Sequence, residues 1–249
     1  MDNHICSIMQ PTFLPWIGYF DLIDAADKFV FYNDVQFSKQ SWQCRNRIKT
    51  ANGIVWLTVP VKKHLLSAKI NEIEINNLKP WTPKFIKTLF HNYRKTAHFA
   101  EVYDFIEQVA VNKKYLRLSD FSIDIIKAIV SKIGINTKLT LSSNTNTLEM
   151  NREDRLVEIC HAMDCNTYLS TKGSSSYIEA SNDGGVFSKN HINLLYHNYI
   201  HPEYQQSYGK FEPYMSIVDL LFNEGFIRSL GIIRKGRGQY VSSEKLKLL

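Results

Sequence analysis

The sequence lacks several features that mark proteins built for membranes or for export. None of its apolar runs approaches the roughly 20 residues that are needed to cross a bilayer. The first residues, MDNHICSIMQPTFLPW, lack the basic region and long apolar core of a secretory signal. Internal repeats and low-complexity stretches are also missing. We therefore expect a cytoplasmic protein that does not insert into a membrane.

Cysteine is scarce, with four residues in a chain of 249. Cys6, Cys44, Cys160 and Cys165 form no CxxC pair, and no histidine stands at zinc-finger spacing. This dispersal argues against a disulfide framework. We expect no metal and no cofactor. Cys44 lies in a basic stretch that could lower its pKa, which leaves a reactive thiol as an alternative.

Acidic residues are rare in one long part of the chain. Residues 28–100 hold thirteen Lys or Arg against three acids, a net charge of +10, whereas the whole chain carries +6. This asymmetry favours an anionic ligand, such as a nucleotide, a phosphorylated sugar, an acidic carrier protein or RNA. A solvated basic surface is the alternative.

Apolar residues, in contrast, are plentiful: 44% of the chain is hydrophobic and 12% aromatic. This supply fills a sizeable core and excludes wholesale disorder. The length fits one domain spanning 1–249. The abundant aromatic residues are also compatible with a homodimer.

The chain opens on a βαβ pattern. Residues 5–9 (ICSIM) predict a buried strand, helical spacing follows from Trp16 to Ile23, and residues 28–32 (KFVFY) predict a second strand. Such an order within about thirty residues is typical of a parallel sheet. Further strands are predicted at 53–61, 70–75, 137–141, 167–170 and 193–199, and further helices at 152–163 and 215–222.

Three apolar helical faces lie between Phe85 and Ile133, and Gly134 is a suitable helix stop. The expected architecture is therefore an α/β fold with a mainly parallel sheet. It is interrupted by a helical insertion or subdomain at 82–135.

The segment QPTFLPWIGYFDLI (10–23) contains the first candidate site. Gly18 opens a helix directly after a buried strand, where free backbone N–H groups and the helix dipole favour anions. Ligands of open α/β sheets bind at this end of the strands. The candidate ligand-binding residues are Gln10, Trp16, Gly18 and Tyr19. A rigid turn that buries Trp16 and Tyr19 in the core is the equal alternative.

The same segment resembles the HxGH loop of nucleotidyltransferase-like Rossmann folds. Thr12-Phe13 and Leu22-Ile23 match that pattern, but Trp16-Ile17-Gly18-Tyr19 stands in place of HxGH in a loop one residue shorter. The resemblance implies a Rossmann-like (nucleotidyltransferase-like) fold. The two missing histidines, which would bind the transferring phosphates, argue against nucleotidyl transfer.

A second candidate site is NDVQFSKQSWQCRNRIK (33–49). If this stretch is extended, Arg45, Arg47 and Lys49 face one side together and suit phosphate or carboxylate. Asp34 is a candidate general base or hydroxyl ligand, and Trp42 a stacking surface for a base or sugar. The remaining candidates are Gln36 and Asn46. Alternatively, the loop is only solvated and Asp34 caps a turn.

Two later segments complete the candidates. In YLSTKGSSSY (168–177), a strand ends in a Gly/Ser loop that forms an anion-binding nest, with Lys172, Gly173 and Ser174 as ligands. A plain Ser-rich connector is the alternative. In IHPEYQQ, Tyr204 is a candidate ligand, and His201 follows a strand in a loop where its imidazole could serve as a base.

These segments together resemble the WbqC-like family. The resemblance rests on IMQPTFLPWIGYFDLI, DVQFSKQSWQCRNRIKT, GIVWLTVPV, TYLSTKGSSSYI and FEPYMSIVDLLFNEG, in this order over nearly the whole chain. It implies a bacterial protein of O-antigen, capsule or other surface-glycan (lipopolysaccharide) assembly. The implied chemistry is modification of a nucleotide-linked amino sugar by acyl or aminoacyl transfer. Cys44 stands where the family is expected to have Asn, which argues against a required cysteine nucleophile.

Three functions follow from these observations. The first is a transferase that takes its group from an acyl carrier protein or an aminoacyl-tRNA. The second is a non-catalytic partner of a glycan enzyme, favoured by the missing HxGH histidines and the absence of a recognisable triad. The third is an RNA-binding protein, prompted by the basic segment alone.

Overall fold

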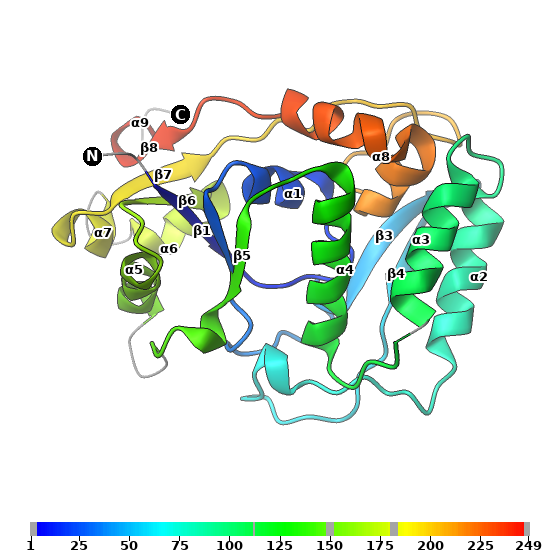
Figure 1. Cartoon of the computed structure of the whole chain (residues 1–249), viewed down its shortest axis with the longest axis horizontal. Helices are drawn as coiled ribbons and strands as arrows, with labels where there is room; N and C mark the ends of the chain where they lie inside the picture. Colours follow the sequence, from blue (N-terminus) through cyan, green and yellow to red (C-terminus); the bar gives the residue numbers. More distant parts are fainter. Residues whose placement is uncertain (1–3, 112, 148–151, 180–183, 247–249) are drawn as a thin grey trace.

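The computed structural model describes residues 4–111, 113–147, 152–179 and 184–246 and contains a six-stranded sheet, which lies toward the end of the molecule that carries the N-terminus (Figure 1). The strands are β1 (Ile5–Met9), β2 (Lys28–Phe31), β5 (Lys138–Leu141), β6 (Thr167–Thr171), β7 (Asn193–His197) and β8 (Val241–Ser242). Their order is β5-β2-β1-β6-β7-β8, all parallel except β8, which pairs antiparallel with β7 (Figure 1). Numbered within this sheet alone, the order is 3-2-1-4-5-6, as in Rossmann folds. The expected mainly parallel, Rossmann-like α/β sheet is confirmed.

Both faces of the sheet are buried, as parallel sheets require. Phe29 and Phe31 of β2 pack into one core with α1 (Ile17–Asp24) and α8 (Ile217–Lys235). Val30, which points to the opposite face, packs into a second core with α5 (Arg152–Ala162), α6 (Ser175–Ile178) and α7 (Gly185–Lys189). The short helix α9 (Ser243–Leu246) follows β8. Alternation along the strands therefore places one helical layer on each face.

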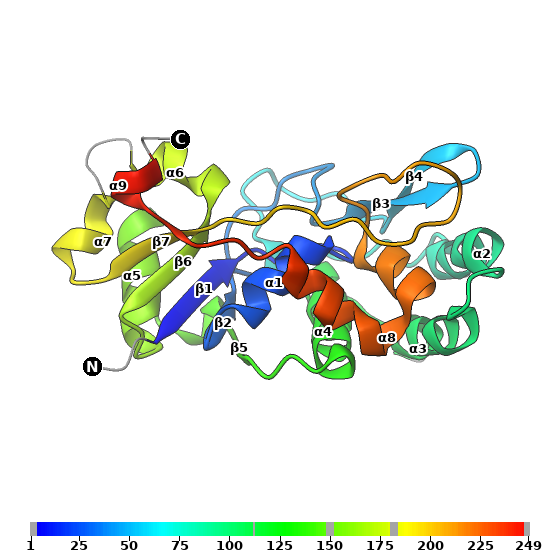
Figure 2. The ribbon, with the colours of Figure 1, turned by 90° about the horizontal axis from the view of Figure 1, so that it is seen from above.

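Between β2 and β5 the chain adds a hairpin and three helices. These are β3 (Arg45–Thr50), β4 (Gly53–Thr58), α2 (Trp81–Tyr93), α3 (Phe99–Val111) and α4 (Leu118–Ile133). Figure 2 shows them grouped with α8 at the end of the molecule far from the N-terminus. The three helices lie where helical faces are predicted, and their role as an insertion or subdomain at 82–135 stays a prediction. Gly134 ends α4 in the left-handed region, with φ of 85°, as predicted.

The predicted strand at 70–75 is wrong. Residues Ile70–Glu72 form a 3₁₀ turn (η1), and the Glu72 carboxylate accepts from the backbone N–H of Lys69 at 2.8 Å. Ile73 and Ile75 are buried as the alternation indicated, but only isolated bridges pair this segment with the rest of the chain. The alternation therefore predicts the burial of this segment correctly. It does not predict the turn, which the contact between Lys69 and Glu72 closes.

Several boundaries also differ from those expected. β4 ends at Thr58 and β7 at His197, whereas the predicted strands continued to 61 and 199. The predicted helix at 215–222 continues to Lys235, across a kink at Gly225 with φ of 73°. Two further 3₁₀ turns, η2 (Ser142–Asn144) and η3 (Lys172–Ser174), follow β5 and β6. None of the helices in the described ranges combines the length and the apolar composition of a membrane-spanning segment.

Candidate functional site

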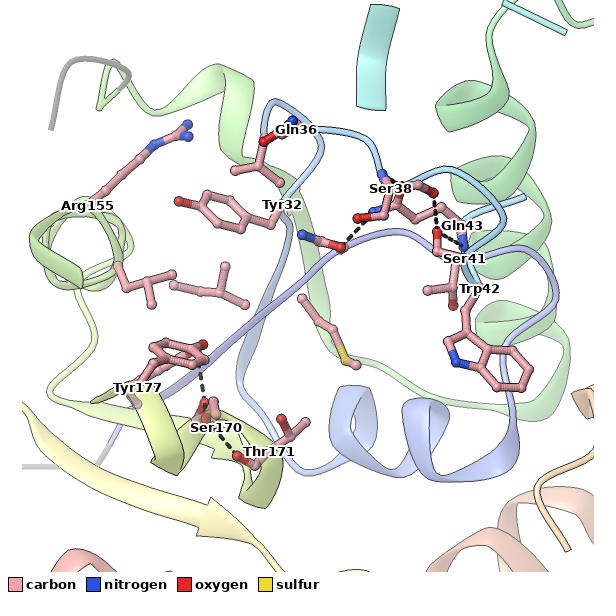
Figure 3. Close-up of a pocket in the computed structure, with 18 residues that line it drawn as sticks. Tyr32, Gln36, Ser38, Ser41, Trp42, Gln43, Arg155, Ser170, Thr171 and Tyr177 are labelled. Carbon is pink, nitrogen blue, oxygen red and sulfur yellow. Dashed lines mark hydrogen bonds between the residues drawn. The ribbon is translucent and has the colours of Figure 1, made fainter. Parts of the chain in front are cut away.

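A cleft opens where the direction of chain connection reverses. From β1 the chain passes through α1 to β2 on one side, and from β6 it passes to β7 on the other. Because β1 and β6 are neighbours, their carboxyl ends form the topological switch point at which open α/β sheets bind ligands. The cleft there has a volume of about 780 Å³ and takes its walls from β1, β6, α5 and the loop after β2 (Figure 3).

One wall of the cleft carries side-chain amides. Gln10 follows β1, and its Oε1 accepts from Gln43 Nε2 at 2.7 Å. The Gln43 Oε1 in turn accepts the backbone N–H of Ser38 at 2.9 Å, and the Ser41 hydroxyl accepts the backbone N–H of Gln43 at 3.2 Å. Figure 3 shows this chain of contacts beside Trp42. Both amides are therefore held in one orientation before any ligand arrives.

The opposite wall carries hydroxyl groups. Ser170 of β6 and Ser174 of η3 lie with their Oγ atoms 2.6 Å apart. Ser170 donates to the Tyr168 hydroxyl at 3.2 Å, and Ser174 donates to the carbonyl of Thr171 at 2.6 Å. Tyr177 of α6 completes this wall (Figure 3). Burial raises the pKa of Tyr168, so its hydroxyl stays protonated and neutral.

Of the residues that the structure describes, one charged side chain, Arg155 of α5, lines the cleft. Its Nη2 donates to Asp34 Oδ2 at 2.6 Å, and the side chains are only 5% and 2% exposed. The Asp34 carboxylate also accepts from the Ser142 hydroxyl at 2.5 Å, while the guanidinium lies 4.9 Å over the Tyr32 ring. The cleft therefore contains a guanidinium whose charge is already balanced by a buried carboxylate.

The sequence-predicted residues divide between this cleft and other places. Gln10, Gln36, Trp42 and Ser174 line the cleft. Lys172 and Gly173 stand beside Ser174 in η3 but are not part of the lining. Asp34 lies behind Arg155 and is not part of it either. Its contacts are those of a partner that fixes Arg155, and the base role predicted for it stays a prediction.

The turn after β1 is held by packing and by Asn46. The Asn46 Nδ2 donates to the carbonyls of Phe13 and Leu14 at 3.0 and 2.7 Å. The Trp16 indole lies against Gly18, where an added Cβ would meet it at 2.2 Å. Tyr19 is buried, and its hydroxyl donates to the Gln10 carbonyl at 3.1 Å. These contacts match the rigid-turn alternative, and anion binding at Gly18 stays a prediction.

The hairpin strand β3 places Arg45, Arg47 and Lys49 on one face, as its extended conformation implies. Lys49 is buried there, with its Nζ 3.2 Å from Gln206 Oε1 and bonded to the carbonyl of Lys210. Its ammonium group therefore holds the 199–216 loop. The Arg47 guanidinium reaches the Tyr214 carbonyl at 3.3 Å.

His201 lies in an aromatic cluster of the same loop. Its ring stacks on Trp16, with centroids 5.9 Å apart, and contacts Tyr204, Phe211 and Tyr214. Burial lowers the pKa of His201, and its Nε2 is buried without a hydrogen-bond partner in the described structure. The Tyr204 hydroxyl donates to Asp219 Oδ2 at 2.9 Å. Neither His201 nor Tyr204 lines the cleft.

Sequence reasoning missed most of the cleft. No local sequence pattern marks Arg155 as a cleft residue, because its partner Asp34 is 121 positions away. It also missed a buried network in which His197 Nε2 lies 2.7 Å from Asp21 Oδ2 and Arg237 Nη2 lies 2.9 Å from Asp21 Oδ1. This network joins α1 to the end of β7 and to the chain after α8. Within the described ranges, no three His, Cys or acidic side chains gather as metal ligands.

Cys44 is buried, and its Sγ lies 3.7 Å from the carbonyl of Ser41. Burial raises the pKa of this thiol. A thiol that stays protonated is a poor nucleophile, so its surroundings oppose the reactive-thiol alternative.

Comparison with known proteins identifies the family. The WbqC-like protein family matches residues 10–228. The chain belongs to this family. It is also 37% identical over 221 residues to the uncharacterized protein Rv1507c of Mycobacterium tuberculosis, a match that covers 88% of this chain and 93% of that protein. No solved structure matches the chain. The resemblance to the WbqC-like family is thus confirmed.

Proposed function

We propose that this WbqC-like protein binds a nucleotide-linked amino sugar, places the sugar in the switch-point cleft, and transfers an acyl or aminoacyl group to its amine. The reaction would serve the assembly of O-antigen or another bacterial surface glycan in the cytoplasm. The observation that carries the proposal is the cleft itself, a cavity of about 780 Å³ at the carboxyl ends of β1 and β6.

The chemistry of the lining supports a sugar as the ligand. Gln10 and Gln43 offer amide donors and acceptors on one wall, and Ser170 and Ser174 offer hydroxyls on the other. Tyr177 and Trp42 add aromatic surface. Because the Arg155 charge is balanced by Asp34, this lining suits a polar but uncharged group rather than a phosphate.

The proposed reaction forms one bond and breaks another. The neutral sugar amine attacks the carbonyl of a carrier thioester or an aminoacyl ester, a C–N bond forms, and the C–S or C–O bond to the donor breaks. The amine proton leaves with the departing thiol or hydroxyl. Among the described residues that line the cleft, none is a His, Cys, Asp or Glu. Positioning of an already activated donor against the amine is then the main contribution. His201 and Asp34 stay predicted bases, but neither lines the cleft, so either would need to reach the amine through a water or a movement of its loop.

A non-catalytic partner of a glycan enzyme is the second candidate. The same observation favours it, since a lining without imidazole, thiol or carboxylate binds well and offers no obvious base or nucleophile. Primary RNA binding rests only on the basic segment 28–100. A homodimer also remains a prediction.

The first test is a thermal-shift titration with UDP-, GDP- and dTDP-linked amino sugars, with CoA, ATP and buffer as controls. A ligand that binds only the folded state raises the midpoint in a dose-dependent way. Ser170→Ala should reduce the shift, because it removes a hydroxyl from the cleft wall. Ser175→Ala is the matched control, because the half-buried Ser175 donates to the Lys172 carbonyl and is not part of the lining.

The second step adds donors to the sugar nucleotide that binds. Acyl carrier thioesters, CoA thioesters and aminoacyl-tRNA are supplied in turn, and the N-acylated sugar is sought by mass spectrometry. Product formation supports the transferase. Binding without product from any donor favours the partner protein, and no shift with any sugar nucleotide contradicts the proposed ligand.

A further inference from the structure

The outer face of the β3–β4 hairpin carries a stack of two tryptophans and two arginines. Arg47 is directly opposite Trp56 in the strand register, and Arg45 lies two residues away on the same face. The other face of the hairpin points into the core, where Ile48 and Leu57 are buried. The arginines and Trp56 therefore point away from the core.

The four side chains form one continuous stack. The Arg45 guanidinium lies 4.4 Å from the Trp56 ring, the Trp56 and Trp42 centroids are 5.3 Å apart, and the Arg47 guanidinium lies 5.5 Å from the Trp42 ring. Trp42 is 46% and Trp56 43% exposed, although indoles are usually largely buried. Two exposed indoles, inclined to each other by 39°, thus form an aromatic surface with a cation at each end.

The charges of this stack are not neutralised. Among the described residues, no ion pair joins Arg45 or Arg47 to a carboxylate. The Arg47 Nε is buried, and none of the described residues forms a hydrogen bond with it. The rings hold both guanidinium groups, and the Tyr214 carbonyl is a further contact of Arg47; none of these contacts cancels a charge. Arg155 in the cleft differs, because Asp34 balances it.

The stack also continues into the cleft. Trp42 belongs both to the stack and to the lining of the cleft, at the side opposite Tyr177 and Arg155 (Figure 3). A ligand that occupies both places needs an uncharged polar part for the cleft. It needs an anionic part with a flat ring for the hairpin.

We propose that the Trp42, Trp56, Arg45 and Arg47 stack binds the nucleoside diphosphate part of the ligand. The base stacks on an exposed indole, and the guanidinium forks bind the phosphate oxygens. The sugar attached to that diphosphate then enters the cleft past Trp42. The placement of the sugar rests on the proposed function, whereas binding of a bare nucleoside diphosphate to the hairpin does not.

The test measures the dissociation constants of bare UDP, GDP and dTDP by isothermal titration calorimetry. Trp56→Ala or Arg45→Gln should weaken the binding of the best of these roughly 5- to 100-fold, as expected for loss of one stacked base or one charge-assisted contact. The control Lys132→Gln removes a cation that lies 5.5 Å over the Phe226 ring, away from the hairpin, and should leave the affinity unchanged. Circular dichroism confirms that each variant is folded.

Ser170→Ala separates the two parts of the ligand. It should leave the affinity for the bare diphosphate unchanged and weaken binding of the corresponding amino-sugar nucleotide. The inference is overturned if no nucleoside diphosphate binds, or if both hairpin variants bind as wild type does. Tighter binding of a single-stranded RNA ten-mer than of any diphosphate, with a steep salt dependence, would also overturn it in favour of nucleic acid.

The failure of either proposal can be recognised separately. If amino-sugar nucleotides bind and are acylated while the hairpin variants behave as wild type, the hairpin site is wrong and the proposed function stands. If nucleoside diphosphates bind to the hairpin but no donor yields product, the hairpin site stands and the transferase is wrong.

Discussion

At His201, burial in an aromatic cluster favours the neutral imidazole and lowers its pKa below the ordinary 6.5. The unfolded chain therefore takes up this proton at higher pH than the folded chain does. The contribution of neutral His201 to the free energy of unfolding is therefore fully present above its ordinary pKa. It is lost as the pH falls from there through the lowered pKa of the folded protein. We expect wild type to lose stability between pH 7.5 and 5 relative to His201→Phe, measured by urea unfolding at each pH. Parallel pH profiles of the two proteins would contradict this.

Gly18 is a second position at which a single side chain decides packing. An added Cβ would meet the Trp16 indole at 2.2 Å, so Gly18→Ala must displace the ring that His201 and Tyr214 contact. We expect a loss of about 1–3 kcal/mol in the free energy of unfolding, as for other overpacked sites. Gly231→Ala is the matched control, because nothing lies within 4 Å and helix propensity should raise stability by roughly 0.5–1 kcal/mol. Equal effects of the two changes would exclude the Trp16 clash.

At the scale of elements, the Asp34–Arg155 pair attaches α5 to the chain that follows β2. Removing one partner leaves a buried charge without compensation. Arg155→Met should therefore lower the free energy of unfolding by about 3–5 kcal/mol. The double variant Asp34→Asn with Arg155→Met should recover part of this loss, since no carboxylate is then left unpaired. Urea midpoints of the two single variants and the double variant test this, and a double variant no more stable than Arg155→Met would argue against it.

At the scale of the whole molecule, the cleft and the hairpin adjoin at Trp42, and we propose that they form one binding surface. Hydrogen exchange should show this directly. An amino-sugar nucleotide should protect backbone amides in β3 and β4 and in 170–178, whereas the bare nucleoside diphosphate should protect the hairpin alone. Amides of α3, which takes no part in the cleft lining, serve as the internal reference. Protection confined to α2 and α3 would place the ligand elsewhere.

Local patterns in the sequence determined much of the architecture. The apolar run at 5–9, the helical spacing after Trp16 and the three helical faces up to Ile133 each predict an element that the structure contains. Alternation along β3 also predicts the shared face of Arg45, Arg47 and Lys49. These features depend on the side-chain period of a strand or a helix, and residues close together in the sequence are enough to show that period.

Tertiary structure alone decided where the candidate residues meet. Gln10 lines the cleft, whereas Trp16 and His201 gather in a separate aromatic cluster, although all three follow strands. The pairing of Asp34 with Arg155 joins residues 121 positions apart. Such contacts depend on the order of strands in the sheet and on which helical layer covers each face. No local period encodes that order, because it results from burying all the apolar faces at once.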